Sequence, residues 1–316
     1  MSQPLVSIVT PSFNQAQFIE ETLDSILNQS YQNIELIVMD GGSTDDTVDI
    51  LKNYNDPRLR WESKPDKGQS DAINQGMQKT SGEILAYLNS DDVYLPGTLK
   101  FVVEYFLAHP DTDALLGSCY IIDGQSQRLT TNYKIKPITL RDMFKKRVIF
   151  PQQSTFWRRR VMDTIGLFDE SLHYRMDYDY WIRMMIAGFQ FGYTDNFLAL
   201  YRVHSLSKSL SQDEKFWRDW FTILDKVYDR DDLPAEIMAL KPVAYSYAHF
   251  YAGESYFRHQ QYGEARPFLR QFLTSPGAAR QKVFALAMYL DCLWGTSLTK
   301  YVTNIYRNVK GVPKST

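Results

Sequence analysis

The sequence predicts an α/β fold in which a doubly wound, mostly parallel, Rossmann-like sheet is followed by an all-helical C-terminal extension. Short strand-like runs alternate with amphipathic segments through the first hundred residues. Repeated strand–helix units of this kind build a parallel sheet with right-handed connections. After about residue 213 the strand-like runs stop and the apolar spacing becomes helical. These two observations define the fold class and the division of the chain.

Four short runs in the first half are expected to form strands of this sheet, because each is rich in apolar residues and too short for a typical helix. They are residues 6–10, 35–40, 59–62 and 84–88. Asn14 follows the first run and is placed to cap a helix. The apolar residues of that helix form one stripe at Ile19, Leu23, Ile26 and Leu27. A helix is also expected after the fourth run, with its apolar face on Leu99, Val102, Val103 and Phe106.

The pattern changes at residue 113. A strand-like run is followed by an irregular basic stretch, and then by short strands mixed with one helix; these segments are residues 114–122, 123–150 and 151–204. We therefore predict one α/β domain over residues 1–211, with halves of about 1–112 and 113–211. The helical extension is predicted over residues 212–316.

Two features of the helical extension leave its role open. The spacing of Gly253, Tyr256 and Ala265 matches one tetratricopeptide-like helix pair, at about 243–275. A single unit does not stand alone, so a helical hairpin packed on the main domain explains it as well as a partner-binding repeat. An apolar segment with Trp294 precedes four cations, Lys300, Arg307, Lys310 and Lys314. This arrangement fits a core helix with a solvated tail or a helix on an anionic membrane surface.

Composition excludes several classes of function. The net charge of −2 gives no basic field for nucleic acid. The two cysteines lie far apart, which favours reduced thiols in a cytosolic protein. The first residues run directly into a predicted strand, and no run of 18 apolar residues occurs. We therefore expect a cytoplasmic protein, with contact at the inner face of the cell membrane and a homodimer left open.

Acidic side chains recur where the predicted strands end. Asp40 precedes a glycine-containing turn, and Asp71 follows a polar loop that could present helix N–H groups to phosphate. Asp91 and Asp92 end the Asn-Ser-Asp-Asp stretch, an oxygen-rich cluster suited to Mg²⁺ or Mn²⁺ with a phosphorylated ligand. The alternative is an Asp pair that caps a helix beginning at Pro96. Asp177 lies near the start of a later helix.

The order and spacing of six motifs resemble a family 2 glycosyltransferase of the GT-A fold, of the bacterial cell-surface polysaccharide type. The motifs are Val-Ser-Ile-Val-Thr-Pro-Ser-Phe-Asn (6–14), Asp-Gly-Gly-Ser-Thr-Asp-Asp-Thr (40–47), Asn-Ser-Asp-Asp (89–92), Gly-Leu-Phe-Asp-Glu (166–170), Asp-Tyr-Asp-Tyr-Trp-Ile-Arg (177–183) and Tyr-Arg-Val-His (201–204). Each motif alone is weak, but together they cover roughly residues 5–210.

The resemblance implies roles for individual residues. The nucleotide-sugar site would comprise Thr10, Pro11, Ser12, Phe13, Asp40, Asp71, Asp91 and Arg202. Asp92 and His204 would hold the metal, with Asp91 near the ribose or donor sugar, and Asp177 would be the catalytic base. The sequence departs from the family pattern at Asn89, where the first metal-motif acid is expected, and at Met176, where a Glu usually precedes the base.

The implied reaction is inverting, metal-dependent sugar transfer in surface polysaccharide biosynthesis. The donor would be a nucleotide-diphosphate sugar, with a UDP-sugar favoured, and the acceptor a hydroxyl of a saccharide or lipid-linked molecule. A divalent cation, Mn²⁺ or Mg²⁺, would neutralise the diphosphate leaving group. One alternative is a catalytically weak scaffold that binds partners through the helical C-terminus. Another is a nucleotidyltransferase, which is disfavoured because residues 10–14 contain no glycine.

Overall fold

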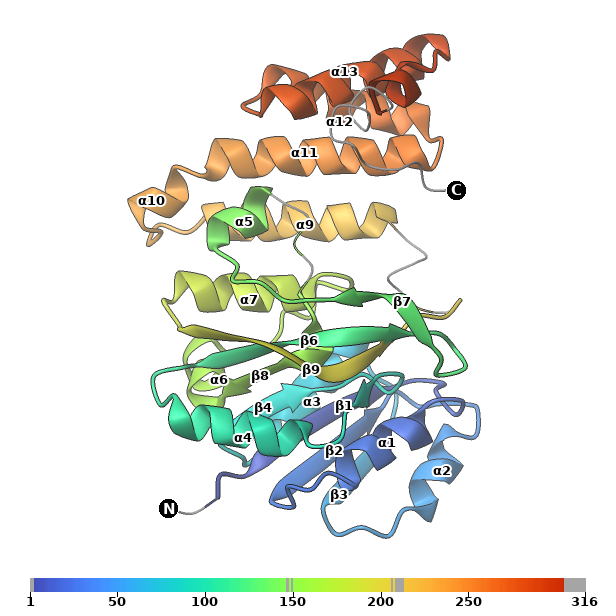
Figure 1. Ribbon diagram of the computed structural model, residues 1–316, viewed down its shortest axis with the longest axis vertical. Coiled ribbons are helices and arrows are strands. Elements are labelled where there is room, and N and C mark those ends of the chain that lie inside the picture. Colours follow the sequence, from blue (N-terminus) through green and yellow to red (C-terminus); the bar gives the residue numbers. More distant parts are fainter. Residues whose placement is uncertain (1–2, 146–147, 149, 206, 208–212, 304–316) are drawn as a thin grey trace. The chain divides into compact units, whose positions relative to one another are not determined.

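A computed structural model describes residues 3–145, 148, 150–205, 207 and 213–303 (Figure 1). The chain divides into two compact units. The first comprises Met1–Thr139 and Val148–Ser207, and the second comprises Leu140–Arg147 and Lys208–Thr316. The predicted domain boundary at residue 211 lies outside the described residues.

The first unit is built on one sheet. Its described strands are β1 (Val6–Ser12), β2 (Ile34–Asp40), β3 (Leu59–Ser63), β4 (Ile84–Tyr87), β5 (Val93–Tyr94), β6 (Ala114–Ile122), β7 (Arg128–Tyr133), β8 (Thr155–Arg158) and β9 (Phe191–Arg202). Their order is β3-β2-β1-β4-β8-β6-β9-β5, with β7 paired to β6. The first four strands are parallel, β8 runs antiparallel between β4 and β6, and β9 is parallel to β6. The predicted α/β class is confirmed.

Helices cover both faces of this sheet. They are α1 (Ile19–Leu27), α2 (Thr47–Asn53), α3 (Gln69–Gln78), α4 (Thr98–Ala108), α6 (Arg159–Ile165) and α7 (Met176–Ile186), with a 3-10 turn at Gln152–Ser154. Apolar residues of α1 and α4 share one core cluster with Val6 and Ile8. Ile37 and Met39 instead pack against Ala72 of α3. Successive strand side chains alternate between faces, so α3 lies on the opposite face from α1 and α4.

The strand register brings the C-terminal ends of neighbouring strands together. Ser12 is paired with Asp40 across β1 and β2, and Asp40 is paired with Ser63 across β2 and β3. β4 ends beside β1, with Val9 opposite Tyr87. The C-terminal ends of β1 to β4 therefore lie along one edge of the sheet, and Asp40, at the end of β2, lies on it.

Two predicted helix starts are wrong. Asn14 does not cap α1, because α1 begins at Ile19 after Phe18. Asn14 instead has a positive φ of 53°, and its Oδ1 accepts a hydrogen bond from Thr44 N at 2.8 Å, which ties the loop after β1 to the turn after β2. Pro96 is not the first residue of a helix either, since α4 begins at Thr98 after Gly97, whose φ is 83°.

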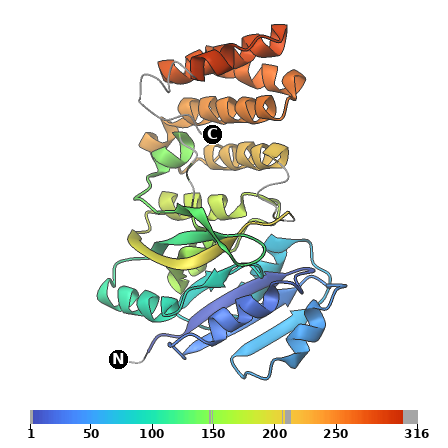
Figure 2. The ribbon, with the colours of Figure 1, turned by 45° about the vertical axis from the view of Figure 1, so that its right-hand side comes forward.

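The second unit is helical in its described part. It contains α5 (Leu140–Lys145), α9 (Asp213–Tyr228), α10 (Ala235–Met238), α11 (Lys241–Arg258), α12 (Tyr262–Thr274) and α13 (Ala279–Trp294). The segment predicted as a tetratricopeptide-like pair folds as α11 and α12, which are antiparallel neighbours (Figure 2). Phe250, Leu269, Phe272 and Met288 join α11, α12 and α13 in one apolar cluster. Within the described chain, no helix combines the length and apolar character needed to cross a bilayer.

Close packing of α11 on α12 depends on Gly253. A Cβ at this position would lie 2.8 Å from Leu269 Cγ and 3.1 Å from Leu269 N. We expect Gly253→Ala to lower the free energy of unfolding by about 1–3 kcal/mol, the usual cost of overpacking. Thermal unfolding followed by circular dichroism measures this change.

Gly263→Ala is the matched control in the neighbouring helix. No atom lies within 4 Å of a Cβ built at Gly263. This variant should unfold at the same temperature as the wild type or higher, because alanine favours helix by up to about 1 kcal/mol. Equal destabilisation by both variants would contradict the packing argument.

Candidate functional site

The candidate site lies at the C-terminal edge of the parallel strands, where ligands bind in open α/β sheets. Asp40 ends β2 and is 2% exposed. Its Oδ2 accepts hydrogen bonds from Gly42 N (3.1 Å), Ser43 N (2.9 Å) and Ser63 Oγ (2.6 Å), and its Oδ1 accepts one from Ser43 Oγ (2.5 Å). A carboxylate has about four acceptor positions, so Oδ1 can take a further donor. Asp40 thus orders the turn after β2 and retains capacity for a ligand.

The end of β1 presents buried hydroxyl groups. Thr10 and Ser12 are 0% and 5% exposed, and their hydroxyl oxygens make no hydrogen bond with the described residues. Pro11 between them is buried, whereas the Phe13 ring is 59% exposed. Burying a hydroxyl without a partner costs roughly 1–3 kcal/mol, judged from protein substitutions. These hydroxyls therefore indicate a position where a bound molecule or water completes their hydrogen bonds.

Asp71 organises the loop before α3. Its Oδ2 accepts a hydrogen bond from Lys67 N at 2.9 Å, and this bond, followed by the Gln75 side chain, lowers the pKa of Asp71. In the same loop Asp66 Oδ1 accepts a hydrogen bond from Gly68 N at 2.8 Å. The carboxylate of Asp71 is thus used inside the loop, at the positive end of α3.

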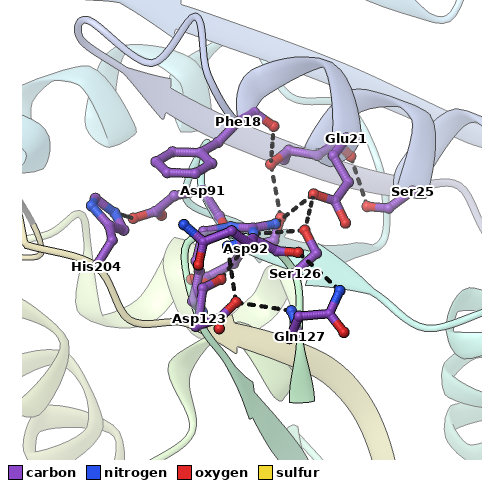
Figure 3. A network of polar contacts seen from close by, with 12 residues as sticks. Phe18, Glu21, Ser25, Asp91, Asp92, Asp123, Ser126, Gln127 and His204 are labelled. Carbon is purple, nitrogen blue, oxygen red and sulfur yellow. Dashed lines mark hydrogen bonds and ion pairs between the residues drawn. The ribbon is translucent and has the colours of Figure 1, made fainter. Parts of the chain in front are cut away.

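Four of the predicted site residues meet at the ends of β4 and β9. Asp91 and Asp92 follow β4, and Arg202 and His204 lie at and after the end of β9. Figure 3 shows the two carboxylates and His204 beside α1 and the turn after β6. Arg202 Nε donates to the Asp91 carbonyl oxygen at 2.7 Å, and Arg202 N donates to Asp92 Oδ1 at 2.9 Å.

The Arg202 guanidinium is fully enclosed at 1% side-chain exposure. Its Nη2 donates to Glu21 Oε2 at 2.6 Å, and its Nη1 donates to Ser126 Oγ at 2.8 Å and to the Asp123 carbonyl at 3.2 Å. Its Cζ lies 4.8 Å from the centre of the Phe18 ring. Acceptors within the protein therefore engage this guanidinium, and the place of Arg202 in the nucleotide-sugar site stays a prediction.

Asp92 is more enclosed than Asp91. It is 1% exposed, and besides Arg202 N its carboxylate has Asn89 Nδ2 at 3.4 Å from Oδ2. Burial, reinforced by the neighbouring Asp91 charge, raises the pKa of Asp92 well above its usual range. The Asp91 side chain is 20% exposed, and its Oδ2 lies 3.0 Å from His204 Nε2. The His204 ring in turn packs on Phe18, with ring centres 4.7 Å apart.

Asp91 and His204 supply part of the ligand set that a divalent cation requires. Among the described residues, no three His, Cys, Asp or Glu side chains converge as a complete metal cage. The Asp91 and His204 side chains do supply one hard oxygen and one imidazole nitrogen within hydrogen-bonding distance. Mg²⁺ is usually bound by one or two carboxylates, waters and substrate phosphates rather than by a full protein cage. The residues present fit a cation of this kind.

Asp177 and Asp179 lie in the first turn of α7 but have different surroundings. Asp179 is 4% exposed, and its Oδ2 accepts a hydrogen bond from Arg183 Nε at 2.7 Å. The other Arg183 nitrogens donate to the carbonyls of Ile165 and Leu167, so this pair anchors α7 to the end of α6. Asp177 has no ion-pair partner among the described residues, and burial raises its pKa from 3.8 to about 6.

Tyr87 connects the two acidic regions. It ends β4, is 2% exposed, and burial together with the charges of Asp177 and Asp92 raises its pKa. Met176, which replaces the acid expected before Asp177, is buried and lies 2.7 Å from Ser70 Oγ through its sulfur. Sequence reasoning missed Tyr87, Phe18 and Ser126. Glu21 was not predicted either, because nothing in the local pattern connects it to Arg202.

Several known proteins are similar to this chain in sequence. A family model described as "Glycosyl transferase family 2" matches residues 7–166. An uncharacterized glycosyltransferase of Rickettsia typhi is 31% identical over 236 residues, which cover 71% of this chain and 73% of that protein. The chondroitin synthase of Escherichia coli is 30% identical over 187 residues, which cover 58% of this chain and 27% of that protein.

Solved structures share the fold over nearly the whole chain. S. aureus TarS 1–349 in complex with UDP-GlcNAc has a TM-score of 0.70 and 18% identity, and the match covers 96% of this chain and 92% of that one. The Pyrobaculum calidifontis mannosyltransferase PcManGT, in complex with GDP-Man and Mn²⁺, has a TM-score of 0.59 and 18% identity, with coverage of 98% and 88%. At this identity the likeness concerns the fold alone, and it confirms the predicted GT-A architecture with its helical C-terminal region.

The raised pKa of Asp177 predicts a pH-dependent effect on stability. Between about pH 4 and pH 6 the native state holds the Asp177 proton more tightly than the unfolded chain does, so the free energy of unfolding falls as the pH rises. Asn cannot ionise. We therefore expect Asp177→Asn to melt at a higher temperature than the wild type above about pH 6, with the advantage disappearing below about pH 4.

Glu62→Gln is a contrast of opposite sign in the same unit. Hydrogen bonds from Lys79 and then Lys64 lower the pKa of Glu62 from 4.5 to about 2. Its carboxylate therefore contributes stability above about pH 4.5 that is lost as the pH falls towards 2, and the Gln variant should be less stable at neutral pH. Differential scanning calorimetry across this range separates the two profiles. If the difference in melting temperature between Asp177→Asn and the wild type did not change with pH, the raised pKa of Asp177 would be wrong.

Proposed function

Because the chain belongs to glycosyltransferase family 2, we propose that it transfers a sugar from a nucleotide-diphosphate sugar to a hydroxyl group in surface polysaccharide biosynthesis. The acceptor would be a saccharide or a lipid-linked molecule. The observation that supports the proposal most directly is that two acidic groups of the site have different surroundings. Asp177 makes no ion pair among the described residues and has a pKa raised to about 6, and Asp91 with His204 forms a separate polar pair.

The donor is assigned to the edge formed by β1 and β2. The unpartnered hydroxyls of Thr10 and Ser12 and the remaining acceptor position of Asp40 suit a base and ribose. Solved structures of the same fold carry UDP-GlcNAc, UDP and GDP-Man. A UDP-sugar is the donor we favour.

We assign the divalent cation, Mn²⁺ or Mg²⁺, to Asp91 and His204. By the family resemblance of the sequence, the expected ligands were Asp92 and His204. We prefer Asp91 because its carboxylate is the one beside the imidazole, whereas Asp92 accepts hydrogen bonds from Arg202 N and is almost fully enclosed. When bound, such a cation neutralises charge on a diphosphate leaving group.

Asp177 is proposed as the general base of an inverting reaction. A pKa of about 6 leaves it mainly ionised at neutral pH, and it gives the carboxylate a greater affinity for the acceptor proton than an ordinary aspartate has. A single displacement at the anomeric carbon needs one base and no protein nucleophile. Asp179 cannot fill this role without giving up its ion pair with Arg183.

A weakly catalytic scaffold remains the second candidate. The amide of Asn89 occupies the first position of the metal motif and accepts a hydrogen bond from Gln69 Nε2 at 2.7 Å, so this position supplies no carboxylate. A screen for nucleotide release from several UDP-, GDP- and other nucleotide sugars in the presence of Mn²⁺ decides between the two. Absence of release and of calorimetric binding for every donor would favour the scaffold.

The base assignment predicts a loss confined to turnover. Asp177→Asn should lower kcat by about 10²–10⁴-fold and leave the donor KM nearly unchanged, because only proton abstraction is lost. In the wild type, kcat/KM should fall below about pH 6, since the base must be ionised. Initial-rate kinetics with the donor found by the screen provide both measurements.

Asp179→Asn is the matched control, two residues away on α7. It removes the negative charge that pairs with Arg183, so it should lower the melting temperature while the folded fraction turns over at close to the wild-type rate. If the folded Asp179→Asn enzyme instead has the lower kcat, Asp179 is the base.

The metal assignment predicts different effects at adjacent carboxylates. Asp91→Asn should weaken Mn²⁺-dependent UDP binding by about 10–100-fold or more, the range seen when groups that orient metal ligands are lost. His204→Gln should act in the same direction, and Asp92→Asn should retain Mn²⁺-dependent binding. Electron paramagnetic resonance of Mn²⁺ with calorimetry of UDP measures this. Loss in Asp92→Asn with retention in Asp91→Asn would restore the assignment made from sequence.

A further inference from the structure

The last long helix of the second unit carries an unusual concentration of exposed apolar side chains. Of the twelve large hydrophobic residues exposed in the described chain, six fall within residues 283–301. They are Val283, Leu286, Leu293, Trp294, Leu298 and Tyr301. The first four lie on one side of α13 by helical spacing, and we call them the α13 face. Trp294 is 69% exposed.

The α13 face is not the side that packs on the rest of the unit. Ala285 and Met288 of α13 are buried in the cluster with Leu269 and Phe272. Figures 1 and 2 both show α13 at the outer end of the stack formed by α9, α11, α12 and α13. The hairpin core is therefore complete without the α13 face.

The exposed charged side chains within residues 279–303 are cations. Asp291 is the only acidic residue between 279 and 303, and it is 6% exposed and accepts hydrogen bonds from Leu298 N (2.8 Å) and Thr299 N (2.9 Å). The same stretch contains Arg280, Lys282 and Lys300. Lys282 Nζ donates to the carbonyls of Phe272 and Leu273, which leaves Arg280 and Lys300 as the exposed cations. Three more cations, Arg307, Lys310 and Lys314, follow in the sequence but lie outside the described residues.

A small cavity adjoins the C-terminal end of the α13 face. It has a volume of about 320 Å³, and its lining includes two cations, Arg258 and Lys300, and the buried carboxylate of Asp291. Three of its lining residues, 295 to 297, lie between Trp294 and Leu298 in the sequence. The Asp291 carboxylate accepts hydrogen bonds from Thr296 Oγ1 and from the backbone N–H groups of Leu298 and Thr299, so the two cations are the groups of this cavity that suit a phosphate.

We propose that the α13 face binds the surface of an anionic phospholipid bilayer, with a lipid phosphate in the cavity lined by Arg258 and Lys300. Exposed Trp, Tyr and Leu side chains with flanking cations are the composition of helices that lie in a membrane interface. A lipid-linked acceptor would then be reached at the membrane itself, a consequence that rests on the proposed function.

A second copy of the chain fits this surface less well. A symmetric dimer through the α13 face would place the same patch against itself. Arg280 and Lys300 would then face cations without an exposed carboxylate between residues 279 and 303 to pair with them. An anionic bilayer can bury the apolar side chains of the α13 face and can pair its phosphate groups with the neighbouring cations.

Vesicle flotation tests the proposal with the full chain. The wild type should float with phosphatidylcholine vesicles containing about one-third phosphatidylglycerol, and not with phosphatidylcholine alone. The double variant Leu293→Gln, Trp294→Gln should bind at least about tenfold more weakly at any salt concentration, because it loses apolar burial. Lys300→Gln should bind about fivefold more weakly at low salt, with the difference disappearing at high salt. Inorganic phosphate should not displace the protein, since it replaces only the headgroup contact.

Matched controls lie in the first unit. Leu129 is 45% exposed, close to the 40% of Leu293, and the Lys100 side chain is 63% exposed. Leu129→Gln and Lys100→Gln should float like the wild type, and circular dichroism should show all variants folded. Donor hydrolysis should be equal in every variant. Its absence in the wild type would end the proposed function and leave the flotation result standing.

Two results would overturn the proposal. One is a wild type that does not float with the anionic vesicles. The other is flotation that is unchanged in the α13 variants. A dimer in light scattering that dissociates in the Leu293→Gln, Trp294→Gln variant, without vesicle binding, would assign the face to a second copy. Retention of the wild type by an acidic protein, without vesicle binding, would assign it to a protein partner.

Discussion

The site depends on one buried cation, the guanidinium of Arg202. It joins the end of β9 to the backbone of Asp91, to Glu21 on α1 and to Ser126 in the turn after β6. Because the Arg202 side chain is only 1% exposed, losing one of these acceptors would leave its charge less well compensated. The positions of Asp91 and Asp92 are therefore coupled to three elements that are distant in the sequence. Arg202 acts here as the group that holds the acidic pair in place.

Strand pairing explains how this arrangement arises. The short strand β5 runs antiparallel to β9, with Val93 opposite Leu200. Extending the same register by two residues places Asp91 opposite Arg202. The parallel strands β1 to β3 independently align Ser12, Asp40 and Ser63. The hydroxyl-rich group at the ends of β1 to β3 and the charged cluster that follows β4 are therefore separate parts of the site.

The sequence was sufficient for features that depend on local pattern. Apolar runs located β1, β2 and β4 to within a few residues, and the spacing of Ile19, Leu23 and Ile26 gave the buried stripe of α1. Features that depend on long-range pairing were not predictable. Two-residue β5 is too short to give a periodic signal, and Asn14 was misassigned because its partner, Thr44, lies thirty residues away. Likewise, only the fold shows that Asp179 is paired with Arg183 while Asp177 is not.

The site differs from the rest of the first unit in how its enclosed polar and charged groups are compensated. Elsewhere in the first unit, buried acids are compensated: Asp113 pairs with Arg160 at 2.5 Å, and Asp179 pairs with Arg183 at 2.7 Å. At the sheet edge, Thr10 and Ser12 hydroxyls have no described partner, and burial raises the pKa values of Asp92 and Asp177. Well-folded sequences confine such conflicts to functional positions. A ligand that supplies hydrogen-bond donors and positive charge at this edge would relieve these costs, so its binding free energy would appear as added stability of the fold. The energetic cost of these groups and the capacity of the edge to bind a ligand are then two consequences of the same side chains.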